Sequence, residues 1–174
     1  MRPERPEEQV AIRGVNTLAF GRPNEADLVD TLRERGQPLV SLVAEEDGRI
    51  VGHIFFSPVI IESDTQAFPA FGLAPMAVLP ERQRRGIGSQ LVRRGLEECL
   101  RIGQPVVVVL GHPTYYPRFG FVPASRKGLY CEYAVPDEAF MVAELLPGIL
   151  QGRTGVVKYL PEFAEVEGAS ADAG

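Results

Sequence analysis

The stretch MAVLPERQRRGIGS, residues 76–89, reads as a strand end, a short basic turn and the start of a helix. A turn before a helix points free backbone N–H groups at one place, and the helix dipole adds partial positive charge there. Gly86 and Gly88 lack a Cβ atom, so phosphate oxygens can approach the backbone closely. The Ser89 hydroxyl adds a donor, and a further phosphate can bind the guanidinium groups of Arg82, Arg84 and Arg85. The stretch therefore predicts a pyrophosphate-binding turn.

Charge is unevenly distributed along the chain. The net charge of −5 argues against a nucleic-acid-binding protein, which needs a basic face. Between Arg82 and Arg101, however, the sequence contains six arginines and only two acidic residues, Glu97 and Glu98. This local positive surplus suggests a polyanionic ligand, although a solvated helix face would look the same from charge alone.

Three phosphate-binding motifs compete for this stretch. The P-loop string Gly-x-x-x-x-Gly-Lys-Ser/Thr does not occur in the sequence. The dinucleotide fingerprint Gly-x-Gly-x-x-Gly would need a glycine where Leu91 stands. Gln-x-x-Gly-x-Gly does occur, at Gln83, Gly86 and Gly88, but on its own it also fits an ordinary helix entry.

Hydrophobic periodicity around the turn predicts an α/β domain with a mixed sheet. Helices are expected over residues 6–20, from the possible cap Asn24 through Leu32, and over residues 87–102. Strands are expected over residues 39–45, 49–61, 67–79 and 105–110, and around 129–135, 140–145 and 156–159. Pro69 and Pro75 lie within one strand and predict an edge or a bulge there.

Length and composition fit one domain over residues 1–167. Residues 168–174 are small and polar, and we expect them to form a disordered tail. No apolar run reaches the roughly 20 residues of a membrane helix, and the charged N-terminus is not a signal peptide. We therefore expect a cytoplasmic protein. Cys99 and Cys131 are too few and too far apart for a metal motif, so no metal is expected, and Cys99 is expected in the core.

Two signatures in order resemble the GNAT superfamily of acetyltransferases. The first is MAVLPERQRRGIGSQLV, an apolar strand followed by Gln-x-x-Gly-x-Gly at a helix start. The second is GHPTYYPRFGFVPA, with an aromatic-tyrosine pair four residues before Gly120-Phe121. The resemblance covers about residues 5–165, and the runs LAPMAV and PDEAFMVAEL are similar to a bacterial subgroup of small uncharacterised members.

The resemblance implies both a fold and a cofactor. The sheet would be mostly antiparallel, flanked by helices, with a V-shaped splay between two central parallel strands at residues 76–78 and 106–110. The co-substrate would be acetyl-CoA, whose pantetheine arm pairs with the backbone of Ala77 and Val78. The Val78 N–H would polarise the thioester carbonyl, and the pyrophosphate would lie on the amides of Arg84, Arg85, Gly86, Ile87, Gly88 and Ser89.

The resemblance also assigns Tyr116 as the acid that protonates the departing thiolate. A phenol is neutral at pH 7 and can donate as sulfur gains charge, but a core aromatic with a satisfied hydroxyl would look the same in sequence. Neighbouring aromatics are expected to be core residues, namely Tyr115, Phe119 and Phe121.

The base that deprotonates the amine is harder to assign. Many GNAT enzymes use a carboxylate on the strand before the turn, but residues 67–79 contain no Asp or Glu. His112, four residues before Tyr116, is a candidate base, with a plain turn residue as the alternative. His53 fits a structural histidine better.

The resulting hypothesis is an acetyl-CoA-dependent N-acetyltransferase whose unidentified primary amine attacks the thioester directly. The alternative is a non-catalytic acyl-CoA-binding module. Expected partners are a small-molecule or peptide amine, with neither nucleic acid nor membrane, and the chain is expected to be a monomer or homodimer. The N-terminal helices and the loop of residues 111–123 would form the acceptor pocket.

Overall fold

The computed structural model describes residues 1–166 and 172–173. In this part of the chain one sheet follows the order β1-β2-β3-β4-β5-β8-β6, with β9 and β10 added beside β3 and β4 and β7 beside β9. The strands are β1 (Arg2–Pro3), β2 (Val40–Glu46), β3 (Arg49–Glu62), β4 (Ala67–Val78), β5 (Val106–Leu110), β6 (Val122–Pro123), β7 (Leu129–Cys131), β8 (Phe140–Glu144), β9 (Gly155–Lys158) and β10 (Asp172–Ala173).

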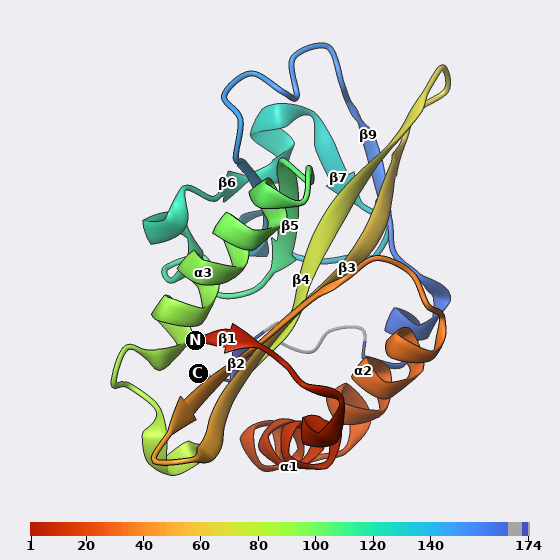
Figure 1. The fold of residues 1–174 in the computed structure, drawn as a ribbon. Coiled ribbons are helices and arrows are strands. Elements are labelled where there is room, and N and C mark those ends of the chain that lie inside the picture. Colours follow the sequence, from red (N-terminus) through yellow and green to blue (C-terminus); the bar gives the residue numbers. More distant parts are fainter. Residues whose placement is uncertain (167–171, 174) are drawn as a thin grey trace.

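Three α-helices cover the two faces of the sheet: α1 (Gln9–Phe20), α2 (Asn24–Glu34) and α3 (Ile87–Arg101). Figure 1 shows α3 on one side and α1 with α2 on the other. Short 3-10 helices lie at Pro6–Glu8, Pro80–Arg82, Tyr116–Phe119, Ala124–Lys127, Asp137–Ala139 and Pro161–Val166. The predicted α/β fold is confirmed, and no helix of the described residues is long and apolar enough to cross a bilayer.

Strand β3 separates the two helical layers by alternating its side chains. A Cβ atom on Gly52 would lie 3.0 Å from Leu91 of α3, and one on Gly95 of α3 would lie 2.4 Å from the Phe56 ring. The intervening His53 faces α1 instead, where it contacts Asn16. Because successive side chains of β3 point to opposite faces of the sheet, this alternation determines which face each helix covers.

The helices follow the predicted ranges but differ in the faces that they bury. In α1 the buried side chains are Ile12, Val15 and Asn16. The spacing of Ala11, Val15, Leu18 and Ala19 in the sequence predicts a single inward apolar face, but Leu18 is 59% exposed. Periodicity favours Leu18 because Asn16 is polar, yet the Asn16 amide group is buried, where its Nδ2 donates to the Ile12 carbonyl and to His53 Nδ1. Two smaller predictions also fail. Pro23 rather than Asn24 precedes α2. Leu100, which helical spacing predicts on the inward face of α3, is 40% exposed.

Strand β4 is central, and a bulge accommodates Pro75 as predicted, whereas Pro69 pairs with Ile60 in regular register. Ile54 of β3 pairs with Met76 and Phe56 pairs with Leu73, so one residue of β3 faces two residues of β4. The extra residue lies at Ala74–Pro75, and so a few residues before Val78. A bulge is where a strand can hold a residue that lacks an N–H donor.

Beyond the bulge β4 separates from its parallel neighbour β5. The two strands pair only at Phe71–Val107 and Gly72–Val108. The predicted V-shaped splay between central parallel strands is therefore confirmed, with its closed end at Gly72. The predicted tail over residues 168–174 lies mostly outside the described residues, but Asp172–Ala173, where no regular structure was expected, form β10.

A buried polar network ties the N-terminal segment to the sheet. The Asn16 amide donates to Nδ1 of His53 at 3.0 Å, so Nε2–H of the neutral ring donates to Ser41 Oγ at 2.9 Å. Ser41 in turn donates to the Glu4 carboxylate, which also accepts from Arg33 at 2.7 Å. His53 is thus a structural histidine with a hydrogen-bond partner at each ring nitrogen.

Ionisation in this network favours the fold at neutral pH. Burial alone would raise the pKa of Glu4, but contacts with His53, Arg33 and Ser41 lower it from 4.5 to about 2. Burial lowers the pKa of His53 below 6.5 despite the nearby Glu4. The unfolded chain therefore takes up both protons at a higher pH than the folded chain, and acid destabilises the protein.

We predict that Glu4→Gln lowers the free energy of unfolding by about 1.5–3 kcal/mol at pH 7, because a charged acceptor is lost from a buried network. The difference in the free energy of unfolding between parent and variant should become smaller as pH falls from 4.5 towards 2. Over this range Glu4 of the parent becomes protonated and its contribution to stability is lost. Urea denaturation at several pH values measures this. Glu97→Gln, which removes an exposed partner of Arg94, is the control, and equal effects of the two variants would contradict the prediction.

Candidate functional site

The turn between β4 and α3 has the backbone that anion binding requires. Arg84 has a φ of +60° and Gly86 a φ of +83°, both in the left-handed region. Such residues reverse the chain sharply, and glycine adopts this conformation without the steric penalty of a Cβ atom. The turn thus leads directly into the first residue of α3, Ile87.

The N–H groups of this turn are not used by the fold. The first hydrogen bond of α3 runs from Gln90 N to Gly86 O at 3.1 Å. No N–H group of residues 84–89 donates to an acceptor in the described residues. Together with the dipole of a 15-residue helix, they form a cup for an anion.

Arginine side chains supply the charge around this cup. Arg84 and Arg85 form no ion pair within residues 1–166 and 172–173. Arg82 lies 3.3 Å from Glu46 and is partly neutralised. Arg118 lies with its guanidinium 4.7 Å from the centre of the Tyr115 ring. Two arginines are therefore available for phosphate, and a third is held near them by an aromatic ring.

A pocket of about 340 Å³ gathers most of the predicted cofactor residues. Its lining includes Val78, Gln83, Arg84, Gly86, Ile87, Gly88 and Ser89, together with Arg82, Tyr115 and Arg118. Ala77 and Arg85 do not line it, and Ala77 is fully buried. Arg118 was missed by the sequence analysis, although its charge within the second signature was a usable signal.

Gln83 braces the turn against the strand. Its Nε2 donates to the Val78 carbonyl at 3.0 Å, so one side chain joins the first residue after the 3-10 helix to the last residue of β4. The glutamine of the motif thus positions the turn, in addition to the cofactor-binding role that its place in the Gln-x-x-Gly-x-Gly motif predicts.

Close packing explains the second glycine of the motif. A Cβ atom on Gly88 would lie 3.2 Å from both the Met76 sulfur and the Tyr115 hydroxyl oxygen. The same Tyr115 hydroxyl lies 3.2 Å from Ser89 Oγ, within hydrogen-bonding distance. Tyr115 was expected to be a core residue, but the structure places its ring against the core and its hydroxyl in the pocket.

Tyr116 lies at the mouth of the V, on the 3-10 helix that follows β5. Its side chain is fully buried and packs edge-on against Tyr115 and Phe121, with centroid distances of 5.1 and 5.5 Å. The ring lies on Gly111, where a Cβ atom would approach it to 2.4 Å. The absence of a side chain at Gly111 therefore leaves room for the Tyr116 ring, and packing fixes the orientation of that ring.

His112 begins the turn that carries both tyrosines. The His112 carbonyl accepts hydrogen bonds from the N–H groups of Tyr115 and Tyr116, at 3.1 and 3.4 Å. The residue itself is exposed. The structure thus brings His112 next to Tyr116 through the backbone, and the role of the imidazole as a base stays a prediction.

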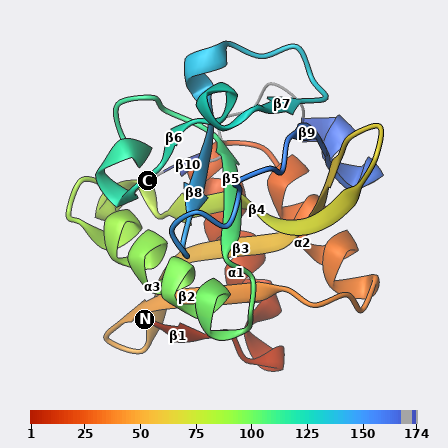
Figure 2. The ribbon, with the colours of Figure 1, turned by 90° about the horizontal axis from the view of Figure 1, so that it is seen from above.

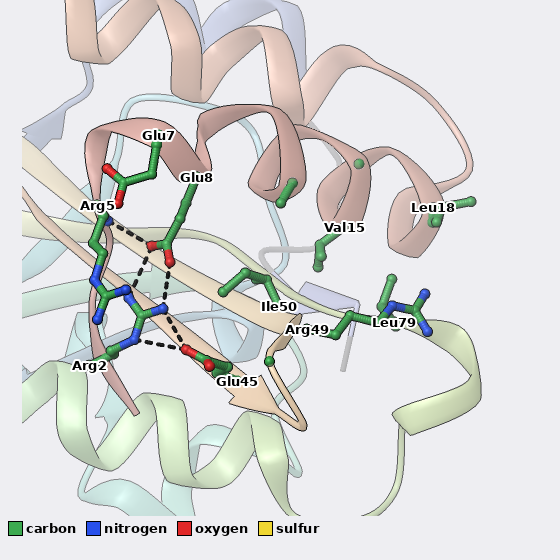
Figure 3. Close-up of a pocket in the computed structure, with 13 residues that line it drawn as sticks. Arg2, Arg5, Glu7, Glu8, Val15, Leu18, Glu45, Arg49, Ile50 and Leu79 are labelled. Carbon is green, nitrogen blue, oxygen red and sulfur yellow. Dashed lines mark hydrogen bonds and ion pairs between the residues drawn. The ribbon is translucent and has the colours of Figure 1, made fainter.

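A larger pocket of about 520 Å³ lies elsewhere, between the N-terminal segment, α1 and the β2–β3 hairpin (Figure 3). Three of its charged side chains are engaged with one another, since Arg2 pairs with Glu8 and Glu45. Leu79 is the one residue of the stretch 76–89 that lines it. Within the described residues no group of three His, Cys, Asp or Glu side chains could hold a metal ion.

Comparison with known proteins assigns this architecture to a family. A family model for the acetyltransferase (GNAT) domain matches residues 1–124. The chain is 45% identical over 130 residues to the uncharacterized N-acetyltransferase YjhQ of Escherichia coli K12, covering 73% of this chain and 72% of that protein. It is 36% identical over 164 residues to the uncharacterized N-acetyltransferase YhbS of the same strain, covering 94% and 97% respectively.

Solved structures agree with these relatives. The crystal structure of YhbS from Escherichia coli in complex with CoA superimposes with a TM-score of 0.86 at 37% identity, covering 94% of this chain and 90% of that one. A GNAT acetyltransferase from Brucella melitensis in complex with acetyl-CoA gives a TM-score of 0.75 at 36% identity, covering 93% and 96%. The family model, the relative YhbS, matched over nearly its full length, and the splayed sheet agree, and the chain belongs to the GNAT family of acetyltransferases.

Proposed function

We propose that the protein binds acetyl-CoA and transfers its acetyl group to a primary amine of a small molecule or peptide. One observation carries this proposal: the separation of β4 from β5 beyond Gly72 opens a backbone edge that leads to the N–H cup at residues 84–89. An acyl-pantetheine arm can pair with this backbone edge, and the pyrophosphate at the end of the arm can bind the N–H groups of residues 84–89. The relatives crystallised with CoA and acetyl-CoA support the same ligand.

In this proposal the turn holds the cofactor and the strand positions its thioester. The amides of Arg84 to Ser89 bind the pyrophosphate, and the guanidinium groups of Arg84 and Arg85 neutralise phosphate charge. The backbone of Ala77 and Val78 pairs with the pantetheine arm. Gln83 acts through Val78, whose carbonyl it holds.

The transfer itself needs an amine nucleophile, an oxyanion donor and an acid. The neutral amine attacks the thioester carbon, and the Val78 N–H stabilises the oxygen that becomes negative. Collapse of the tetrahedral intermediate breaks the C–S bond, and the Tyr116 hydroxyl gives its proton to the CoA thiolate. The amine loses one proton, to His112 or to water, and a proton returns from there to the Tyr116 phenolate through solvent, so that the products are an amide and CoA thiol.

One assay distinguishes this enzyme from the alternative, a non-catalytic acyl-CoA-binding module. Release of free CoA thiol from acetyl-CoA is followed across a panel of amines of different size and charge. Amine-dependent release supports the enzyme, whereas tight binding without release for any amine favours the module. The predicted cytoplasmic location and monomeric or homodimeric state remain part of this proposal.

We predict that Gly86→Asp weakens acetyl-CoA binding at least 10-fold relative to Gly86→Asn. Both side chains tolerate the left-handed conformation better than others and have nearly the same shape. Nothing lies within 4 Å of a Cβ atom at this position, so both variants should fold. Only the aspartate brings a negative charge to the cup, where it repels pyrophosphate. Isothermal titration calorimetry measures the two affinities, and equal values would mean that phosphate does not bind at this turn.

We predict that Tyr116→Phe lowers kcat by about 10²- to 10⁴-fold, the contribution of a positioned acid, with little change in KM for acetyl-CoA. Tyr115→Phe is the matched variant, because it removes a hydroxyl that contacts Ser89 in the cofactor pocket. It should raise KM about fivefold, the effect of one neutral hydrogen bond, and leave kcat nearly unchanged. Steady-state kinetics with an accepted amine distinguish the two patterns, and the reverse pattern would move the acid role to Tyr115.

A further inference from the structure

The terminal strand β10 pairs with the part of β4 that lies inside the V. Asp172 pairs with Met76 and Ala173 with Ala77, in parallel orientation. Strand β3 occupies the other edge of β4 along its length, from Ala67 to Val78. Strand β10 therefore lies on the same edge as β5, in the space that opens where the β4–β5 ladder ends (Figure 2).

This position coincides with the one assigned above to the pantetheine arm. Each backbone N–H group makes one good hydrogen bond, and two chains cannot share the same length of a strand edge. Strand β10 is in register with Met76 and Ala77 in the structure, and in the proposed complex the pantetheine arm lies along Ala77 and Val78 on the same edge. The strand β10 and the acyl-pantetheine arm therefore cannot occupy this edge of β4 at the same time.

We propose that β10 is an autoinhibitory strand that competes with acetyl-CoA for the open edge of β4, an inference that rests on the proposed function. The inhibitor belongs to the chain itself, so its effective concentration does not fall on dilution. It is also short, with two paired residues, so local opening releases it without unfolding the domain. Acetyl-CoA then binds the open fraction of molecules, and its apparent affinity is reduced by that fraction.

Deletion of residues 167–174 tests the competition directly. We expect the shortened chain, ending at Val166, to bind acetyl-CoA about 3- to 30-fold more tightly, the range set by two or three backbone hydrogen bonds. In steady-state kinetics KM for acetyl-CoA should fall by the same factor while kcat is unchanged. Hydrogen exchange supplies a readout without cofactor: an amide among residues 76–78 should exchange faster in the shortened chain.

Two substitutions separate backbone pairing from charge. Asp172→Pro combined with Ala173→Pro removes both N–H groups, so whichever one faces β4 is lost, and should reproduce the deletion. Asp172→Ala removes the same negative charge but keeps both N–H groups, and should behave like the full chain. Equal effects of the double-proline variant and of Asp172→Ala would overturn the pairing model.

The outcomes also separate this inference from the proposed function. If the full and shortened chains bind acetyl-CoA with equal affinity, β10 is not inhibitory and the proposed function stands. If neither chain binds acetyl-CoA while thermal unfolding shows both to be folded, the proposed function fails and the inference fails with it. Tighter binding by the shortened chain, with faster exchange at residues 76–78, supports both.

Discussion

Backbone hydrogen bonding in the centre of the sheet is the constraint on which the site depends. A buried strand must satisfy its N–H and C=O groups on two edges, yet β4 pairs with β5 at only two positions. The remaining groups on that edge are open to another partner with donors and acceptors in an extended arrangement. A pantetheine arm and a peptide strand both have this character, and so the same geometry explains the proposed co-substrate and the proposed inhibitor.

The sequence predicted this region well because its signals are local. The glycines of the turn, the prolines of β4 and the β-branched run of β5 each dictate backbone conformation over a few residues. What the sequence misjudged depends on distant partners. Asn16 is buried only because His53 meets it across the layers, and Tyr115 reaches the pocket only because Ser89 of α3 lies opposite its hydroxyl.

The same distinction explains why β10 was not foreseen. Short, polar sequences have little intrinsic preference for a strand, so composition favoured an irregular tail. The partner decides the conformation here, since an open strand edge can order almost any segment that approaches it in register. The family resemblance likewise placed Tyr116 and the turn but named no acceptor, because an acceptor site depends on side chains that gather from several elements.

The hydrogen bond from Gln83 to the Val78 carbonyl sets a distance between two parts of the site. It fixes how far the anion cup lies from the end of β4, and thus how far a phosphate group can lie from a thioester laid along that strand. A carrier arm shorter or longer than pantetheine would reach the V out of register, with its carbonyl misaligned with the Val78 N–H. In the proposed complex this side-chain amide would therefore contribute to selection for the length of the carrier.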